Sequence, residues 1–159
     1  MPKGGNSSSG GGGGSGSDIG CRVFNSAQIA IPNAALTALT FDSERWDTDT
    51  MHSTSSNTNR ITFTTAGKYI VGGNVEWLAN TIGIRDVVIR LNGATRILWQ
   101  SLGAGAAPFN TPIQSVATMY NFAAADYIEL MVVQTSGGSL NTETNANWSP
   151  EFWAQKVLG

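Results

Sequence analysis

Few side chains in this chain have the types and spacing that catalysis or metal binding requires. His52 is the only histidine and Cys21 the only cysteine. A catalytic triad needs a base beside a nucleophile on a sharp turn, and no such turn motif surrounds a serine here. A zinc site needs several cysteine or histidine ligands. We therefore expect no enzymatic activity and no zinc, and we interpret His52 as an exposed polar residue of a loop.

An acidic run could bind a hard cation such as calcium. It consists of Asp42, Glu44, Asp47 and Asp49. An EF-hand loop starting at Asp47 would need a glycine at its sixth position, and the sequence has none there. Short acidic side chains also accept hydrogen bonds from backbone amides in turns. We expect such capping roles and no cofactor, and we keep calcium as an alternative.

Tryptophans could stack on sugar rings. The chain has Trp46, Trp77, Trp99, Trp148 and Trp153. Trp77 and Trp99 lie at alternating strand positions, which favours the core or an interface. Trp148 lies in a polar stretch and is the best candidate for an exposed ring, although packing within the fold is favoured for it as well. The segment 103–112 is rich in Gly, Ala and Pro and carries Phe109, so it reads as a loop at one end of the domain. We name His52, Phe109 and Trp148 as candidates for binding loops.

The elements that position these side chains should be short strands. Apolar residues alternate with polar ones, as at Ile61 and Phe63, and turn residues separate the runs. Asn92-Gly93 is a strong hairpin signal because both residues tolerate positive φ. No segment has a convincing helical repeat. The sequence therefore predicts an all-β antiparallel sandwich or jelly roll.

The run 127–134 is apolar on both faces, apart from Glu129. A single sandwich buries only one face of each sheet. The second apolar face indicates a subunit interface, to which we assign Tyr127, Leu130, Val132 and Phe152.

The composition limits the kinds of partner that this chain can bind. The net charge is −2 and only 13% of the residues are charged, so no basic area for nucleic acid is expected. No apolar run approaches the length that crosses a membrane. A single cysteine excludes an intrachain disulfide, and its apolar neighbours predict that Cys21 is buried.

The N-terminal segment differs from the rest. Residues 4–17 are almost entirely Gly and Ser, without the third-position glycine repeat of collagen. Such a segment cannot bury apolar area, so we divide the chain into a flexible tether or anchor over 1–20 and a folded domain over 21–159. Gly4, Gly5, Gly11 and Gly12 represent the anchor. No apolar signal segment follows Met1, which predicts synthesis in a cytoplasm.

Four features of the folded part follow one another in a recognisable order. Residues 63–69 combine an aromatic strand, a glycine turn and a tyrosine; Asn92-Gly93 forms a hairpin; Asp126 precedes an apolar strand; and the chain closes on Ser149–Phe152. This set resembles the globular head of complement C1q and its tumour-necrosis-factor (TNF) relatives, over about residues 21–159. Ala125 stands where that family usually has glycine.

The resemblance implies a trimeric jelly roll that binds other molecules and performs no chemistry. Together with the tether it predicts a bacteriophage virion protein, on the head or a fibre, attached through the tail to a capsid or fibre protein. There it would sit on the virion surface and contact the host. The alternative is a bacterial lectin-like, spore-surface or cell-surface trimer that binds a glycan or a protein.

Overall fold

The computed structural model describes residues 18–105 and 111–157. The predicted anchor glycines, Phe109 and most of the tether lie outside these residues. The strands are β1 (Gly20–Phe24), β2 (Ala30–Ile31), β3 (Thr37–Ala38), β4 (Ser43–Asp47), β5 (Ile61–Thr62), β6 (Gly67–Glu76), β7 (Ile84–Leu91), β8 (Thr95–Gly103), β9 (Ile113–Phe122), β10 (Tyr127–Gln134), β11 (Leu140–Asn141) and β12 (Glu151–Lys156).

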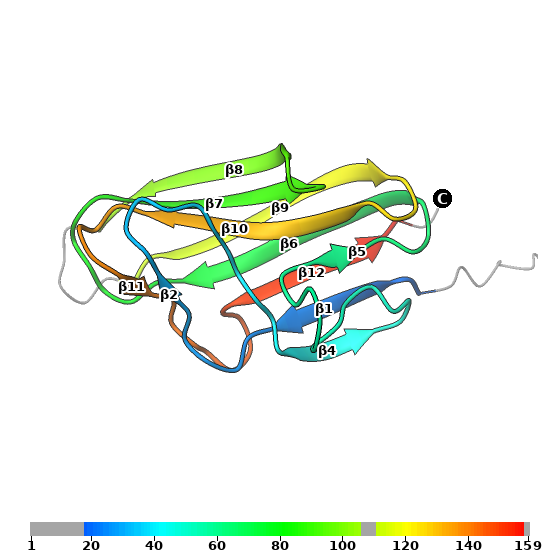
Figure 1. Ribbon diagram of the computed structural model, residues 1–159, viewed down its shortest axis with the longest axis horizontal. Helices are drawn as coiled ribbons and strands as arrows, with labels where there is room; N and C mark the ends of the chain where they lie inside the picture. The colour runs from blue at the N-terminus through cyan, green and yellow to red at the C-terminus, as the bar shows by residue number, and fades with distance from the viewer. Residues whose placement is uncertain (1–17, 106–110, 158–159) are drawn as a thin grey trace, which may run out of the picture.

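Two antiparallel sheets stack face to face (Figure 1). The first sheet has the order β4-β1-β12-β6-β9. The second has the order β3-β10-β7-β8, and β5 also pairs with β10. Strands far apart in the sequence, such as β1 and β12, are neighbours, which is the connectivity of a jelly roll. The described residues contain no helix long and apolar enough to cross a membrane.

The core lies between the sheets and follows the predicted alternation. On β6, Tyr69, Val71 and Val75 point inward and are fully buried. Phe63 stacks on Phe122 with ring centroids 3.8 Å apart. The Tyr69 hydroxyl donates to the Thr65 carbonyl at 2.7 Å, so its polar end is satisfied at the core boundary.

Strand β10 requires a correction of the sequence interpretation. Leu130, Val132 and Phe152, which we assigned to a subunit interface, are fully buried in the core of one chain. Glu129 and Met131 on the opposite face of β10 are also almost fully buried without a second subunit. The chain itself covers the outer face at Glu129, which accepts from Asn59 at 2.6 Å and from Arg90 at 2.9 Å, while β7, β3 and β5 pair alongside β10. These side chains are therefore not free for a subunit contact.

The two ends of the sandwich differ. Gly20 at the start of β1 pairs with Gln155 near the end of β12, so residues 18–20 and 155–157 lie together at what we call the proximal end. The Asn92-Gly93 hairpin lies at the same end, with φ of 50° and 70°. The turns 78–83 and 135–139 lie at the opposite, distal end (Figure 1). A group carried on residues 1–17 would join the domain at the proximal end.

Candidate functional site

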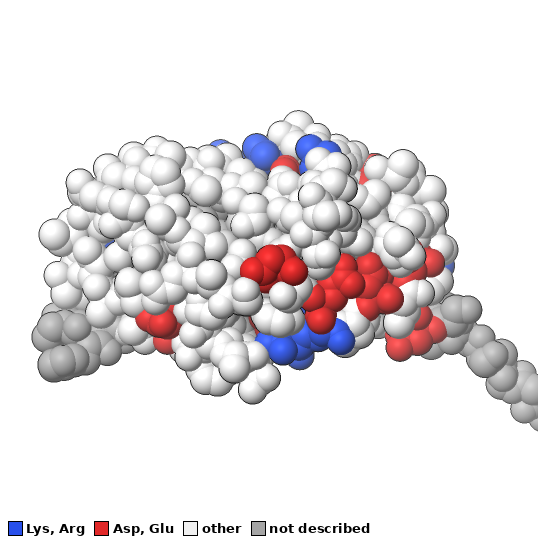
Figure 2. Space-filling model, turned by 60° about the horizontal axis from the view of Figure 1, so that its bottom comes forward, with Lys and Arg blue, Asp and Glu red and all other residues white. Residues whose placement is uncertain are grey.

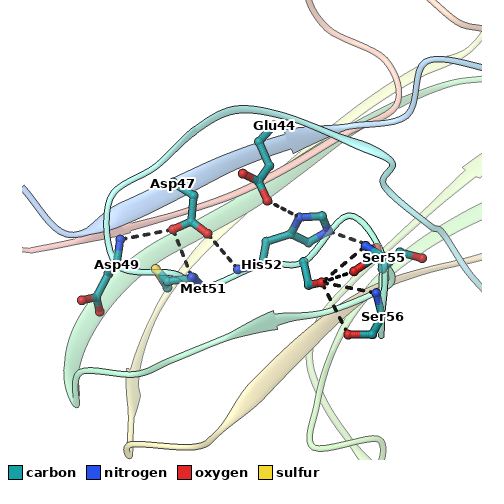
Figure 3. A network of polar contacts seen from close by, with 9 residues as sticks. Glu44, Asp47, Asp49, Met51, His52, Ser55 and Ser56 are labelled. Carbon is teal, nitrogen blue, oxygen red and sulfur yellow. Dashed lines mark hydrogen bonds and ion pairs between the residues drawn. The ribbon is translucent and has the colours of Figure 1, made fainter.

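The loop 48–60 is built around Asp47 and His52 (Figure 3). The Asp47 carboxylate accepts hydrogen bonds from the backbone amides of Asp49, Met51 and His52, at 3.2, 3.0 and 2.9 Å. His52 Nδ1 lies 3.0 Å from Glu44 Oε1. The acidic residues of this stretch thus hold the loop to β4.

His52 is not the exposed residue that the sequence predicted. Its side chain has no exposed surface, and its second ring nitrogen lies 3.3 Å from the Thr58 carbonyl oxygen. Both nitrogens are engaged, so the ring fills the space between β4 and the loop and has neither the exposure of a binding-loop residue nor a free nitrogen for catalysis. Nothing in the sequence around His52 indicates that its side chain is buried, because the burial depends on how the loop 48–60 folds against β4.

Asp42 has the capping role that the sequence predicted. Its carboxylate accepts from the Ser26 amide at 2.9 Å and from the Ser26 hydroxyl at 2.6 Å. Burial alone would raise the pKa of Asp42, but the hydrogen bonds from Ser26 and Ser43 outweigh it and lower the pKa. In the described part of the chain, no three His, Cys, Asp or Glu side chains are grouped to hold a metal ion.

Cys21 is fully buried, as the sequence predicted. Burial raises the pKa of its thiol far above the ordinary value, and the nearby carboxylates of Asp47 and Glu44 add to the shift. The thiol is therefore protonated at neutral pH and is a packing group, not a nucleophile.

The tryptophans divide into three environments. Trp77 is buried, and its indole N–H donates to Gln114 at 3.0 Å, which fits the predicted core position. Trp148, the candidate for an exposed ring, is exposed at the edge of loop 143–148 and donates to the buried Glu76 at 2.9 Å. Trp99 stands on β8 with 59% of its surface exposed, so it is not a core residue.

Trp46 and Trp153 share the outer face of the first sheet. The strand register places Trp46 beside Arg22, and Arg22 beside Trp153, across β4, β1 and β12. Together with Asn74 and Gln155, these three side chains line a hollow of about 300 Å³, which we call the tryptophan hollow. Sequence reasoning considered both tryptophans for sugar stacking but could not place them together.

The other half of this face is apolar and lies over β6 and β9. Ile70 pairs with Met119, and both are exposed, Met119 by 57%. Ile113 at the start of β9 is exposed as well. Gly72 and Ala117 are paired on the same face, and the Trp153 ring lies over Gly72. We call Ile70, Ile113 and Met119 the apolar half.

A buried carboxylate fixes the arginines of this region. Glu151 has a side chain only 1% exposed, and it accepts from Arg22 Nε at 2.7 Å and from Arg45 Nε at 2.7 Å. Arg22 also donates to the Asn147 carbonyl at 2.9 Å, and Arg45 donates to the Ala146 carbonyl. Glu151 therefore ties β1 and β4 to loop 143–148 and holds the Arg22 guanidinium at the hollow.

The charge distribution limits the kinds of ligand. Figure 2 shows acidic groups beside a basic cluster along the lower part of this side, further basic groups at its top, and a mostly uncharged remainder. No broad basic area appears on this side, in keeping with the net charge of −2.

The remaining predicted interface residue, Tyr127, begins β10 and is half-buried. The Arg60 guanidinium lies over its ring, 4.1 Å from the centroid. The chain itself therefore covers this aromatic face.

Comparison with known proteins identifies the fold. No protein-family model matches the sequence, and no curated protein matches it. Among solved structures, Eiger TNF from S. frugiperda superposes with a TM-score of 0.66 at 14% identity, covering 89% of this chain and 93% of that one. The globular domain of zebrafish complement 1qA gives 0.62 at 10%, covering 88% and 98%, and murine APRIL gives 0.67 at 8%, covering 88% and 99%. The chain thus has the jelly-roll fold of C1q and TNF domains, as the sequence predicted.

Proposed function

We propose that this chain is a non-enzymatic, trimeric binding domain displayed on a larger particle. The leading setting is a bacteriophage virion, as a head decoration, head fibre or fibre tip that contacts a host surface. The observation that carries the proposal is the apolar half on the outer face of the first sheet, whose three side chains remain 39–57% exposed in the single chain. The engaged state of His52 and the buried thiol of Cys21 support a role without chemistry.

The apolar half supports self-association. Exposed apolar side chains that gather on a flat face lower the free energy when another surface covers them, by roughly 25 cal/mol per Å² of apolar area. β9 is also a free edge of its sheet, so its backbone groups can approach a neighbouring copy. A contact between different surfaces of identical copies forms a ring when its rotation closes, and the C1q/TNF resemblance implies a ring of three. This contact replaces the one first assigned to β10.

Oligomeric state tests this part of the proposal. Light scattering should give three times 16.7 kDa for the intact chain. Met119→Glu should place a charge in the contact and lower the mass toward that of one chain, with an unchanged β-sheet circular dichroism spectrum. Ile82→Glu is the matched control, because Ile82 is exposed at the distal end. A single-chain mass for the unaltered protein would refute the trimer.

The N-terminal segment supports attachment. Ordering a Gly-rich segment on a partner costs roughly 1–2 kcal/mol per residue, so one copy would bind weakly. Three copies on one trimer raise the avidity by roughly 10²–10⁴. Because residues 18–20 lie at the proximal end, attachment there leaves the distal turns free to meet a target.

Deletion of residues 2–17 tests attachment. The shortened protein should fold and form trimers but should be absent from purified particles that carry the full chain. A version with residues 4–17 in scrambled order controls for composition. Full occupancy by the deletion would mean that the domain itself holds the particle.

The bacterial lectin-like alternative has one observation in its favour. The tryptophan hollow combines the exposed Trp46 and the half-buried Trp153 with amide side chains, which suits a carbohydrate.

A further inference from the structure

We propose that a pocket in the loop 48–60 binds a small oxyanion, a carboxylate or a phosphate group, of a molecule on the target surface. The inference deepens the proposed binding function, on which it rests, because it names a ligand class and a site on the displayed domain. The pocket has a volume of about 220 Å³. Sites for drug-sized ligands measure roughly 300–1,000 Å³, so this one suits a single small group. Its lining includes hydroxyl, amide and guanidinium side chains, from Thr50, Ser53, Ser56, Asn57, Arg60 and Thr62. We call it the loop pocket.

Arg60 places a fixed cation at this pocket. Its guanidinium lies over the Tyr127 ring, 4.1 Å from the centroid, which holds the group in one plane. The buried Nε lies 3.9 Å from Glu129 Oε1, beyond the range of a hydrogen bond. Within residues 18–105 and 111–157 this nitrogen has no hydrogen-bond partner. The side chain as a whole is 35% exposed, so a ligand in the pocket can reach the guanidinium.

The charges around Arg60 leave the pocket side positive. Glu129 accepts from Arg90 Nε and Nη2 at 3.1 and 2.9 Å, and from the Asn59 amide at 2.6 Å. One carboxylate therefore serves two arginines, and Arg60 has the longer contact with it. No aspartate or glutamate lines the loop pocket. This balance favours an anion over a neutral or a cationic ligand.

The acidic residues of the neighbouring chain are engaged elsewhere. Glu44 contacts the His52 ring, and the Asp47 carboxylate accepts from backbone amides of the loop. Asp49 accepts from a threonine hydroxyl. Their charges still weaken the long-range attraction of an anion, so binding depends on direct contacts with Arg60 and the hydroxyl groups. We expect a dissociation constant in roughly the millimolar range for one small anion.

Hydroxyl and amide groups supply the further donors that an oxyanion needs. Ser53 Oγ accepts from the backbone amides of Ser55 and Ser56, at 3.3 Å each (Figure 3). The hydroxyl hydrogens of Ser53 and Ser56 can rotate toward a ligand, and the Asn57 side chain has two N–H donors. Hydrogen bonds from several such donors to a charged oxygen are stronger than those between neutral groups.

The backbone of the pocket is held in an unusual conformation. Thr50 and Asn57 both line the pocket, with φ of 54° and 49°. Positive φ is rare for a β-branched residue such as threonine. Residues held in such a conformation cluster at ligand sites. Because Asp47 also fixes the loop through the Met51 and His52 amides, the pocket is pre-formed and little free energy is lost on ordering it.

The loop pocket lies away from the surface that the proposed trimer covers. Ile61 on β5 is fully buried, so Arg60 and Thr62 on either side of it point away from the core. Since β5 pairs with β10, these two side chains lie on the outer side of the second sheet. The apolar half lies on the outer face of the first sheet. Three loop pockets on one particle-bound trimer would therefore stay open and act together on a target.

Titration calorimetry at constant ionic strength provides the test. The full chain is titrated with methyl glucuronide and with methyl phosphate, which carry a carboxylate and a phosphate. Methyl glucoside is the neutral counterpart of the glucuronide, because it has a hydroxymethyl group in place of the carboxylate. We expect at least one of the two anions to bind saturably and methyl glucoside not to bind. The anion that binds more tightly identifies the target group as an acidic sugar or a phosphate.

Substitutions locate the binding. Arg60→Gln should weaken the affinity for the bound anion by roughly tenfold or more, because it removes the cation that contacts the ligand. Arg96→Gln is the matched control: it removes the same charge from an exposed arginine of the same sheet, whose guanidinium lies over Trp99, and it should bind as the unaltered protein does. Ser56→Ala leaves the contact of Arg60 with Tyr127 in place and should weaken binding by roughly threefold. It keeps the test decisive if Arg60→Gln fails to fold, as judged by circular dichroism.

Three outcomes would overturn the inference. These are an absence of saturable binding for both anions, equal binding of methyl glucoside, or an equal loss of affinity in Arg96→Gln. Each of them leaves the trimer and the attachment through the tail standing, because light scattering and particle occupancy are measured without these ligands. A single-chain mass for the unaltered protein contradicts the trimer and leaves the loop pocket in place, since all of its residues come from one chain.

Discussion

Replacing Glu151 by Ala should cost more stability than any other single change on the outer face of the first sheet. Glu151 is the common acceptor for Arg22 and Arg45, and three hydrogen bonds from their guanidinium groups end on its carboxylate. Removing one partner of a buried ion pair costs about 3–5 kcal/mol, because the remaining charges lose their compensation.

Partial exposure of the arginines reduces this figure. The side chains of Arg22 and Arg45 are 37% and 25% exposed, so water can take over some of the lost hydrogen bonds. We therefore expect a loss of about 2–4 kcal/mol for Glu151→Ala. Glu151→Gln keeps the shape but turns an amide toward the guanidinium groups, and it should lose about half as much.

Equilibrium unfolding in urea at a fixed protein concentration measures this loss as a shift of the midpoint at constant slope. Glu143→Ala is the control, because Glu143 lies on the neighbouring loop, is half-buried and accepts one side-chain hydrogen bond from Gln28 at 3.2 Å. It should lose less than about 1 kcal/mol. A loss of the same size in both variants would refute the reasoning that Glu151 is the buried centre of a charge network.

Three further predictions concern groups whose environments the structure defines. The folded-state pKa of Asp42 is lowered, so the stability that its carboxylate contributes is present above the unfolded pKa and is lost as the pH falls through the folded pKa. The thermal midpoint of the unaltered protein should therefore exceed that of Asp42→Asn at neutral pH, and this difference should shrink in acid. Cys21 should react with a thiol reagent at neutral pH only upon unfolding, and fast labelling of the native protein would contradict its raised pKa. His52→Ala should lower the free energy of unfolding by about 1–3 kcal/mol, measured by urea denaturation, because it removes a fully buried imidazole together with its contacts to Glu44 and to the Thr58 carbonyl. An unchanged midpoint would restore the interpretation of His52 as a surface residue.

The strands and the core were accessible from the sequence because both depend on local patterns. Tyr69, Val71 and Val75 alternate along β6, and all three are buried. The Asn92-Gly93 turn adopts the positive φ angles that these residue types favour. Such features need no knowledge of what the strand pairs with.

The features that depend on long-range pairing were not accessible. Arg22 and Glu151 are separated by 129 positions, and nothing local to either residue indicates the other. An apolar pattern on both faces of β10 predicts that something covers the strand, but it does not distinguish a second subunit from the rest of the same chain. The hollow between Trp46 and Trp153 likewise exists only because β1 lies between β4 and β12.

Because the first and last strands are neighbours, the chain could begin and end elsewhere and still form the same fold. β1 and β12 are paired neighbours, and the Lys156 amide donates to the Ile19 carbonyl at 2.8 Å. A short peptide could join residue 157 to residue 18 with no rearrangement of either sheet. New ends fit in the turn 135–139, where a side chain at Gly137 or Gly138 would meet no neighbouring atom within 4 Å. Such a circularly permuted protein would carry its linker at the distal end and present the Asn92-Gly93 end outward, so the same domain could be mounted in either direction on a carrier.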